Sequence, residues 1–139
     1  MPDIAAQTPV SDQKRGIILV VEDDSFLRTL LSGKLRHEGF ELFEATDGRQ
    51  ALDFLKSNRP ILILLDLMMP GVDGFQVLES VRRDTRTKDI PVIVLSNVGE
   101  KQMIERVQQL GADDYLIKAH FVLDEIIERI TKVLKKRYM

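Results

Sequence analysis

Short apolar runs alternate with stretches of helical spacing along most of the chain. Three runs of consecutive aliphatic residues occur at Ile17–Val21, Ile61–Leu65 and Val92–Leu95. Runs of this length and purity are typical of strands that are buried on both faces of a parallel sheet. Two further strands are predicted at Glu41–Thr46, which is more polar and suits a sheet edge, and at Tyr115–Ile117.

The segments between these strands carry apolar residues three or four positions apart, which is the spacing of one helix face. Five helices are predicted, beginning near Ser25, Gly48 and Gly74 and covering Gly99–Leu110 and Val122–Lys136. Asp24 or Ser25 can cap the first helix, and Gly39 and Gly111 supply stops after the first and the fourth.

The strict alternation of strand and helix predicts the fold class. Five strands and five helices in this order predict an α/β fold, with a five-stranded parallel sheet and helices on both faces. The length of 139 residues suits a single domain. Residues 1–14 are polar, contain two prolines and show no periodicity, so we expect a disordered tail there and one domain over residues 15–139.

Composition narrows the classes of function. The chain has no cysteine, which excludes disulfides, thiolate metal sites and thiol catalysis. Its 20 basic and 22 acidic residues leave a net charge of -2, which argues against direct binding of nucleic acid. The start lacks the features of a signal peptide and the apolar runs are too short to span a bilayer, so a cytoplasmic protein without membrane contact is predicted.

Chemistry-bearing side chains follow the predicted strands. In an open parallel sheet, ligands bind beyond the carboxyl ends of the strands. The residues at these ends are Glu22 and Asp23, Asp66, Ser96, and Lys118. Clustered carboxylates repel one another, so they need a compensating cation, and Mg²⁺ is the natural candidate because it prefers carboxylate, water and phosphate oxygens. A carboxylate nucleophile, a metal, a lysine and a hydroxyl together indicate phosphoryl transfer.

Each of these residues alone has a more ordinary interpretation. The acidic triplet that begins at Glu22 could be a solvated turn that caps a helix, and Asp66 and Ser96 could be turn residues. Lys118 alone would be read as a surface lysine. Their joint occurrence at four strand ends favours a functional site.

Four stretches of the sequence carry a resemblance to a known family, and they read ILVVEDDSFLR, ILILLDLMMPGVDG, VIVLSN and GADDYLIK. Together they resemble the receiver domain of the response regulators of two-component signalling, over roughly residues 16–137. The resemblance implies a flavodoxin-like fold, and it implies a stand-alone receiver or a fragment of a longer regulator.

The resemblance also implies a metal site and a phosphorylation site. Asp66 would be the phosphoacceptor. Asp23 would bind Mg²⁺ directly and Glu22 would bind it more loosely, with Asp66 and the backbone carbonyl of Met68 as further ligands. In this family the phosphoryl donor is a phosphohistidine on a histidine kinase or a histidine phosphotransfer protein.

Three more residues acquire roles from the resemblance. Ser96 would be the hydroxyl that moves toward the phosphoryl group, Lys118 would pair with a phosphoryl oxygen, and Tyr115 would turn inward on activation. The surface of the fourth helix, fifth strand and fifth helix would then change its affinity for a partner. The protein would be a monomer or weak dimer that slowly removes its own phosphoryl group, and it would not turn over external substrates.

The sequence departs from the family pattern in three places. Glu22 stands where many receivers have Asp, and Ser96 where Thr is frequent. Ala119 follows Lys118 where the family usually has Pro, which leaves open whether this peptide bond is cis or trans. Met68 and Val98 lie two residues after Asp66 and Ser96, at positions that tune hydrolysis in the family, and both are apolar.

Other functions compete with this interpretation. A phosphatase with an aspartate nucleophile generally has a second acid two residues later, where this chain has Met68. A binding module that works without phosphorylation on the same scaffold is the main alternative. A nucleotide-binding fold is disfavoured, because no glycine-rich phosphate loop follows the first strand.

Overall fold

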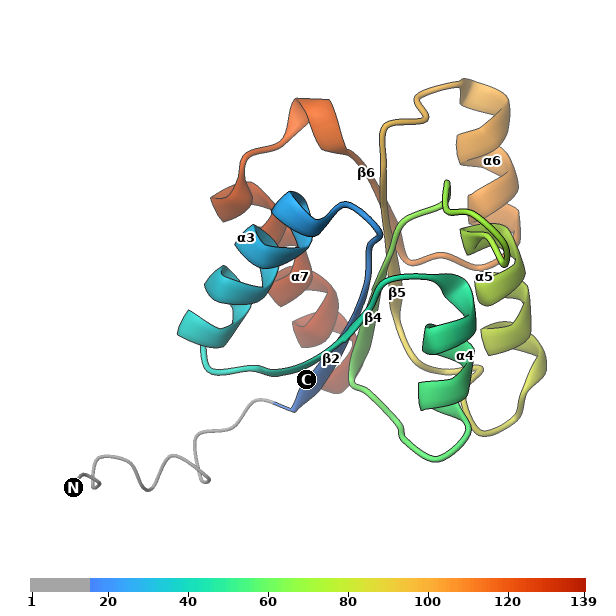
Figure 1. Cartoon of the computed structure of the whole chain (residues 1–139), viewed down its shortest axis with the longest axis horizontal. Helices are drawn as coiled ribbons and strands as arrows, with labels where there is room; N and C mark the ends of the chain where they lie inside the picture. Colours follow the sequence, from blue (N-terminus) through green and yellow to red (C-terminus); the bar gives the residue numbers. More distant parts are fainter. Residues whose placement is uncertain (1–15) are drawn as a thin grey trace.

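A computed structural model describes residues 16–139 and contains one five-stranded parallel sheet with helices on both faces (Figure 1). The strands are β2 (Ile17–Val21), β3 (Glu41–Ala45), β4 (Leu62–Leu65), β5 (Val92–Ser96) and β6 (Asp114–Ile117). The helices are α3 (Ser25–His37), α4 (Gly48–Leu55), α5 (Gly74–Arg83), α6 (Lys101–Gln109) and α7 (Leu123–Tyr138). The tail predicted for residues 1–14 lies outside the described residues.

The predicted fold class and element order are confirmed. The strand order is β3-β2-β4-β5-β6, so the more polar strand lies at a sheet edge as expected. The first strand has the predicted bounds, and the other element ends differ from the predicted ones by at most two residues. A short 3-10 helix at Lys118–His120 was not predicted. Within residues 16–139, no helix has the combination of length and apolarity that crossing a bilayer requires.

The core forms two layers, one on each face of the sheet. Helices α4, α5 and α6 cover one face, while α3 and α7 cover the other (Figure 1). Along β4, Ile63 and Leu65 pack into the first layer and Leu62 and Leu64 into the second. Burying each such side chain contributes about 1.5–3 kcal/mol. A strand buried on both faces therefore reads as an uninterrupted aliphatic run.

Aspartates begin three of the helices at the carboxyl edge of the sheet. The carboxylates of Asp24, Asp47 and Asp73 accept hydrogen bonds from backbone amides of the first helical turn. Gln76 completes a capping box with Asp73. Each such cap contributes about 1 kcal/mol. Helix α6 differs, because in the described part of the chain Glu100 at its start makes no side-chain cap bond.

The first helix exposes part of its apolar stripe. Leu31 and Leu35 are buried against the sheet, whereas Phe26 is 74% exposed and Leu30 is 40% exposed. The apolar stripe on α3 is therefore wider than the part of it that the core buries. The exposed residues, Phe26 and Leu30, lie in the first two turns of the helix, near the acidic residues that follow β2.

Arg82 binds the chain at the amino end of the sheet, opposite the carboxyl ends of the strands. Its guanidinium donates hydrogen bonds to the carbonyls of Lys88, Ile90 and Gly111, which precede β5 and β6, and to the carboxylate of Asp113. Charge-assisted bonds of this kind are stronger than neutral ones. These bonds tie together the segments that lead into β5 and β6 at the amino end of the sheet.

Gly74 lets α5 approach the strand end that carries Asp66. Its amide donates to the Leu67 carbonyl at 2.9 Å. A Cβ atom at this position would lie 2.3 Å from the Asp66 carbonyl oxygen and 2.6 Å from the Leu67 Cα. Both atoms belong to the backbone, so they could yield only if the strand end moved.

We expect Gly74→Ala to destabilise the protein by about 1–3 kcal/mol, the usual cost of overpacking a rigid site. Gly33→Ala is the matched control, because within residues 16–139 an added Cβ would meet nothing within 4 Å apart from its chain neighbours and the backbone of its own helix. That change should stabilise α3 by about 0.5–1 kcal/mol. Urea unfolding measures both, and equal effects of the two substitutions would contradict the close approach.

Candidate functional site

The carboxyl ends of four adjacent strands bring the predicted site residues to one edge. Glu22 follows β2, Asp66 follows β4, Ser96 ends β5 and Lys118 follows β6. The parallel register pairs Val21 with Leu65, so the next residues, Glu22 and Asp66, come side by side. The Asp66 amide also donates to the Val21 carbonyl at 3.0 Å. Residues up to 96 positions apart in sequence thus share one site only because the sheet is parallel.

Three carboxylates converge at this edge. One oxygen from each of Glu22, Asp23 and Asp66 lies within 4.8 Å of the others. Glu22 is 2% exposed and Asp66 is 5% exposed, whereas Asp23 is open to solvent. Hard oxygen donors in this number, with one side open for water and phosphate, suit Mg²⁺. The Met68 amide donates to the Asp66 carboxylate at 3.4 Å, which keeps the Met68 backbone beside the cluster.

Lys118 lies between the two buried acids. Its Nζ is 2.8 Å from the Glu22 carboxylate and 3.3 Å from that of Asp66. Burial alone would lower the pKa of Lys118, but the hydrogen bond with Glu22 and the charge of Asp66 outweigh it and raise the pKa above its usual value. Lys118 therefore carries its charge in this site.

One ammonium does not balance the buried acids. Burial raises the pKa of Glu22 from 4.5 to about 7, against the lowering effect of its bond with Lys118. Burial likewise raises the pKa of Asp66, although the charge of Lys118 opposes the change. Negative charge at this edge is costly without a further cation, which is the electrostatic condition for binding a divalent metal.

The peptide bond between Lys118 and Ala119 is trans, as are all peptide bonds in residues 16–139. Lys118 opens the 3-10 helix Lys118–His120, and this tight turn brings its side chain over the acids. The absence of proline after Lys118 thus leaves the lysine in place. The Lys118–Ala119 bond, left open as cis or trans by the sequence, is therefore trans.

Ser96 and Tyr115 are linked through the loop after β5. The buried Ser96 hydroxyl accepts a hydrogen bond from the Val98 amide at 3.3 Å. The Tyr115 hydroxyl donates to the Val98 carbonyl, and burial raises the pKa of this phenol. One loop residue, Val98, therefore contacts both predicted switch residues.

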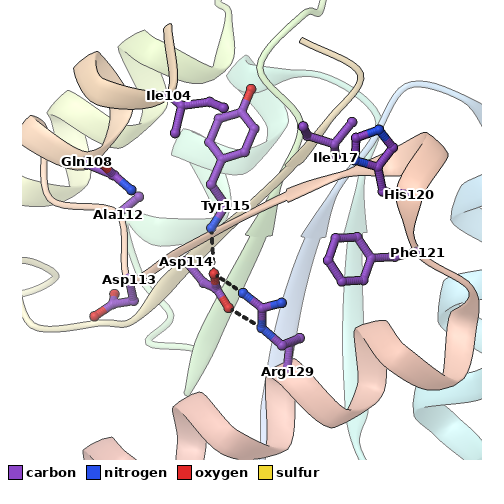
Figure 2. A pocket seen from close by; sticks show the side chains of 10 residues that line it. All are labelled: Ile104, Gln108, Ala112, Asp113, Asp114, Tyr115, Ile117, His120, Phe121 and Arg129. Atoms are coloured by element: carbon purple, nitrogen blue, oxygen red, sulfur yellow. Dashed lines mark hydrogen bonds and ion pairs between the residues drawn. The ribbon is translucent and has the colours of Figure 1, made fainter. Parts of the chain in front are cut away.

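Tyr115 also lines a cavity of about 350 Å³ between α6, β6 and α7 (Figure 2). Asp114 and Arg129 form a two-point ion pair at its edge, at 2.7 and 2.8 Å. The guanidinium of Arg129 also lies 5.4 Å from the centre of the Phe121 ring. This cavity belongs to the surface predicted to change on activation.

Sequence reasoning assigned no role to Arg28, although the structure places it against the site. Its Nη1 donates to the Glu22 carbonyl at 2.8 Å, and its Nε lies 3.4 Å from the Glu44 carboxylate on β3. The available signal was a basic residue four positions after Asp24, on the helix that the acidic turn starts. Nothing in the sequence pointed to the partner on β3.

Fold and site together define a class of signalling domain. The family described as "Response regulator receiver domain" matches residues 18–131. The chain belongs to this family.

Two curated relatives are similar to the chain over most of its length. It is 40% identical over 121 residues to the DNA-binding dual master transcriptional regulator RpaA of Synechocystis, covering 86% of this chain and 49% of that protein. It is 38% identical over 117 residues to sporulation initiation phosphotransferase F of Bacillus subtilis, covering 84% of this chain and 92% of that protein. The chain thus spans about half the length of the DNA-binding regulator.

Solved structures of response regulators are also similar to this chain. The receiver domain of Francisella response regulator 1452 has a TM-score of 0.80 at 31% identity, covering 88% of this chain and 98% of that one. The Mn²⁺-bound form of response regulator Rcp1 has a TM-score of 0.72 at 30% identity, covering 87% and 90%. Receiver domains bind Mg²⁺ at an acidic pocket, and in this chain Glu22, Asp23 and Asp66 form an acidic cluster.

The raised pKa of Glu22 predicts a dependence of stability on pH. The folded state favours neutral Glu22, so this contribution is complete below the ordinary glutamate pKa of 4.5 and is lost as the pH rises through about 7. Glu22→Gln cannot titrate. In EDTA, its unfolding free energy relative to wild type should therefore rise between about pH 5 and about pH 8. A difference that stays constant or falls over this range, measured by urea unfolding, would contradict the effect of burial.

Proposed function

We propose that this protein is a phosphoacceptor switch in which Asp66 takes a phosphoryl group from a phosphohistidine on a histidine kinase or histidine phosphotransfer protein. Residues 15–139 would form the receiver domain. The observation that carries the proposal is the position of Asp66, which shares one edge with two other carboxylates and with Lys118. Together, these groups can bind both a divalent cation and a phosphoryl group.

The transfer exchanges one bond for another. A carboxylate oxygen of Asp66 attacks phosphorus, the bond between phosphorus and the donor imidazole nitrogen breaks, and the electron pair stays on that nitrogen. Mg²⁺, held by Glu22, Asp23, Asp66 and the Met68 carbonyl, would neutralise charge on the phosphoryl oxygens. The Lys118 ammonium would then leave the Asp66 carboxylate and pair with a phosphoryl oxygen.

Access to Asp66 requires Lys118 to move. The Asp66 carboxylate is almost covered, and Lys118 is one of the groups that touch it. A metal that takes over the charge of Glu22 and Asp66 would weaken the hold of these acids on the lysine. Metal binding and opening of the nucleophile are thereby coupled in this proposal.

A shift at Ser96 would reach the surface through Val98. Movement of the Ser96 hydroxyl toward the phosphoryl group would release the Val98 amide, and the Val98 carbonyl holds the Tyr115 hydroxyl. Because α6 starts without a side-chain cap, this loop can rearrange at low cost. The α6–β6–α7 surface would thus change its affinity for a partner protein.

Two observations support a protein as phosphoryl donor. A cavity of about 320 Å³ beside Lys118 is lined mainly by aliphatic and aromatic side chains, including the exposed Leu30 and Val122. Exposed apolar side chains of this kind mark protein interaction sites. A relative of similar length is named as a phosphotransferase, which fits a place in a phosphorelay. We propose contact with proteins in the cytoplasm, as a monomer or weak dimer, and no direct contact with DNA.

The burial of Asp66 favours one alternative, a binding module that works without phosphorylation. The two proposals differ in what Asp66→Ala does to capture of the partner. The switch requires that this variant no longer responds to a phosphodonor, whereas the module would bind its partner unchanged.

Incubation with acetyl phosphate and Mg²⁺ should add the mass of one phosphoryl group to the intact protein. Asp66→Ala should remain unlabelled, and EDTA should abolish labelling of the wild type. Asp53→Ala, which removes an exposed acid on α4, is the control and should label normally. Absence of label on wild type, or equal labelling of Asp66→Ala, would refute the proposal.

The acyl phosphate should be long-lived, because the apolar side chains of Met68 and Val98 cannot orient an attacking water. A Met68→Asn/Val98→Thr double variant should lose its label about tenfold faster, equivalent to about 1.4 kcal/mol in the barrier. The apolar control Met68→Leu/Val98→Ala should decay at the wild-type rate. Time courses of intact mass measure all three, and equal decay of the polar variant and wild type would count against this role.

A further inference from the structure

The backbone of the acidic turn between β2 and α3 is held at several points. The Glu22 amide donates to the Ala45 carbonyl at 3.0 Å, and the Asp24 amide donates to the Glu22 carboxylate at 3.1 Å. Asp24 in turn caps α3. The Glu22 carbonyl is held by Arg28, whose Nη1 lies at 2.8 Å.

The hydrogen bond from Arg28 acts on the peptide unit that links Glu22 to Asp23. The Glu22 carbonyl belongs to the peptide unit between Glu22 and Asp23, and a planar peptide turns as one body. A charged donor on this oxygen therefore sets the direction in which the Asp23 side chain leaves the turn. Unlike Glu22 and Asp66, Asp23 is exposed, so its direction depends on the backbone that carries it.

Glu44 keeps Arg28 in this position. The Arg28 side chain is only 17% exposed, and its Nε lies 3.4 Å from one oxygen of Glu44. The other oxygen of Glu44 binds Arg36 at 3.0 Å. Glu44 thus anchors the guanidinium from a neighbouring strand and offsets its positive charge close to a cation site.

We propose that Arg28 is a positioning residue for the divalent metal. Held by Glu44, it orients the peptide between Glu22 and Asp23 so that both carboxylates face Asp66. The inference rests on the metal site of the proposed function and adds the residue that organises it.

Charge and geometry predict opposite effects when Arg28 is replaced. As a charge alone, Arg28 repels a cation, so its removal would tighten metal binding. As a positioning residue, it aligns the ligands, so its removal weakens binding. The sign of the change in affinity therefore separates the two.

The experiment measures Mn²⁺ binding from the free-ion electron paramagnetic resonance signal, together with the rate of labelling by acetyl phosphate as a function of Mn²⁺. Arg28→Gln should raise the Mn²⁺ dissociation constant by about tenfold, while the labelling rate at saturating Mn²⁺ stays within about threefold of wild type. Arg28→Lys, which can still donate to the Glu22 carbonyl, should recover most of the affinity. Arg36→Gln is the matched control, because Arg36 binds the same Glu44 but takes no part in the five bonds that hold the acidic turn, and it should bind Mn²⁺ like wild type.

An unchanged or lower Mn²⁺ dissociation constant in Arg28→Gln would overturn the inference. Failure of Arg28→Lys to recover the affinity for Mn²⁺ would do so too. If Arg28→Gln does not fold, Glu44→Gln tests the same anchor, and undiminished Mn²⁺ affinity in that variant would overturn it. Failure of the proposed function looks different, because wild type itself would then neither bind Mn²⁺ nor accept a phosphoryl group.

Discussion

The interaction on which this site depends is the contact of the Lys118 ammonium with two buried carboxylates. Glu22 and Asp66 stand at the ends of adjacent strands, where burial penalises their charge. Lys118 reaches both of them from the strand end on the far side of β5. One lysine compensates only part of three acids, so the site keeps a demand for positive charge. That demand suits the site to a divalent cation, which in the proposed function would also neutralise the charge of the incoming phosphoryl group.

The loops at the two ends of the sheet are held by different sets of hydrogen bonds. Arg82 joins the segments that precede β5 and β6 through partly buried, charge-assisted hydrogen bonds. At the carboxyl ends, the loop after β5 is held mainly by two bonds to Val98, and α6 begins without a side-chain cap. In the proposed function, a change at Ser96 would therefore reach Tyr115 through Val98.

Most of the fold could be predicted because the two sequence patterns that mark its strands and helices are local. Aliphatic runs mark strands covered on both faces, and aspartates mark helix starts, so the order of elements followed directly. Contacts between distant segments were harder. The exposure of Phe26 and Leu30 could not be predicted from the sequence of α3. The width of an apolar stripe on a helix does not reveal how much of that stripe the neighbouring elements cover. The contact of Arg28 with Glu44 was also missed, because it joins α3 to an edge strand.

The sequence by itself determined which residues stand at the strand ends, and thus the candidate acids, hydroxyl and lysine. It did so because strand ends follow from hydrophobic pattern, which is a property of neighbouring residues. Only the tertiary structure decided that Lys118 lies between Glu22 and Asp66, that its peptide bond is trans, and that Asp66 is nearly covered. These features depend on strand order, register and the burial of charge, which exist only once separate segments have packed together.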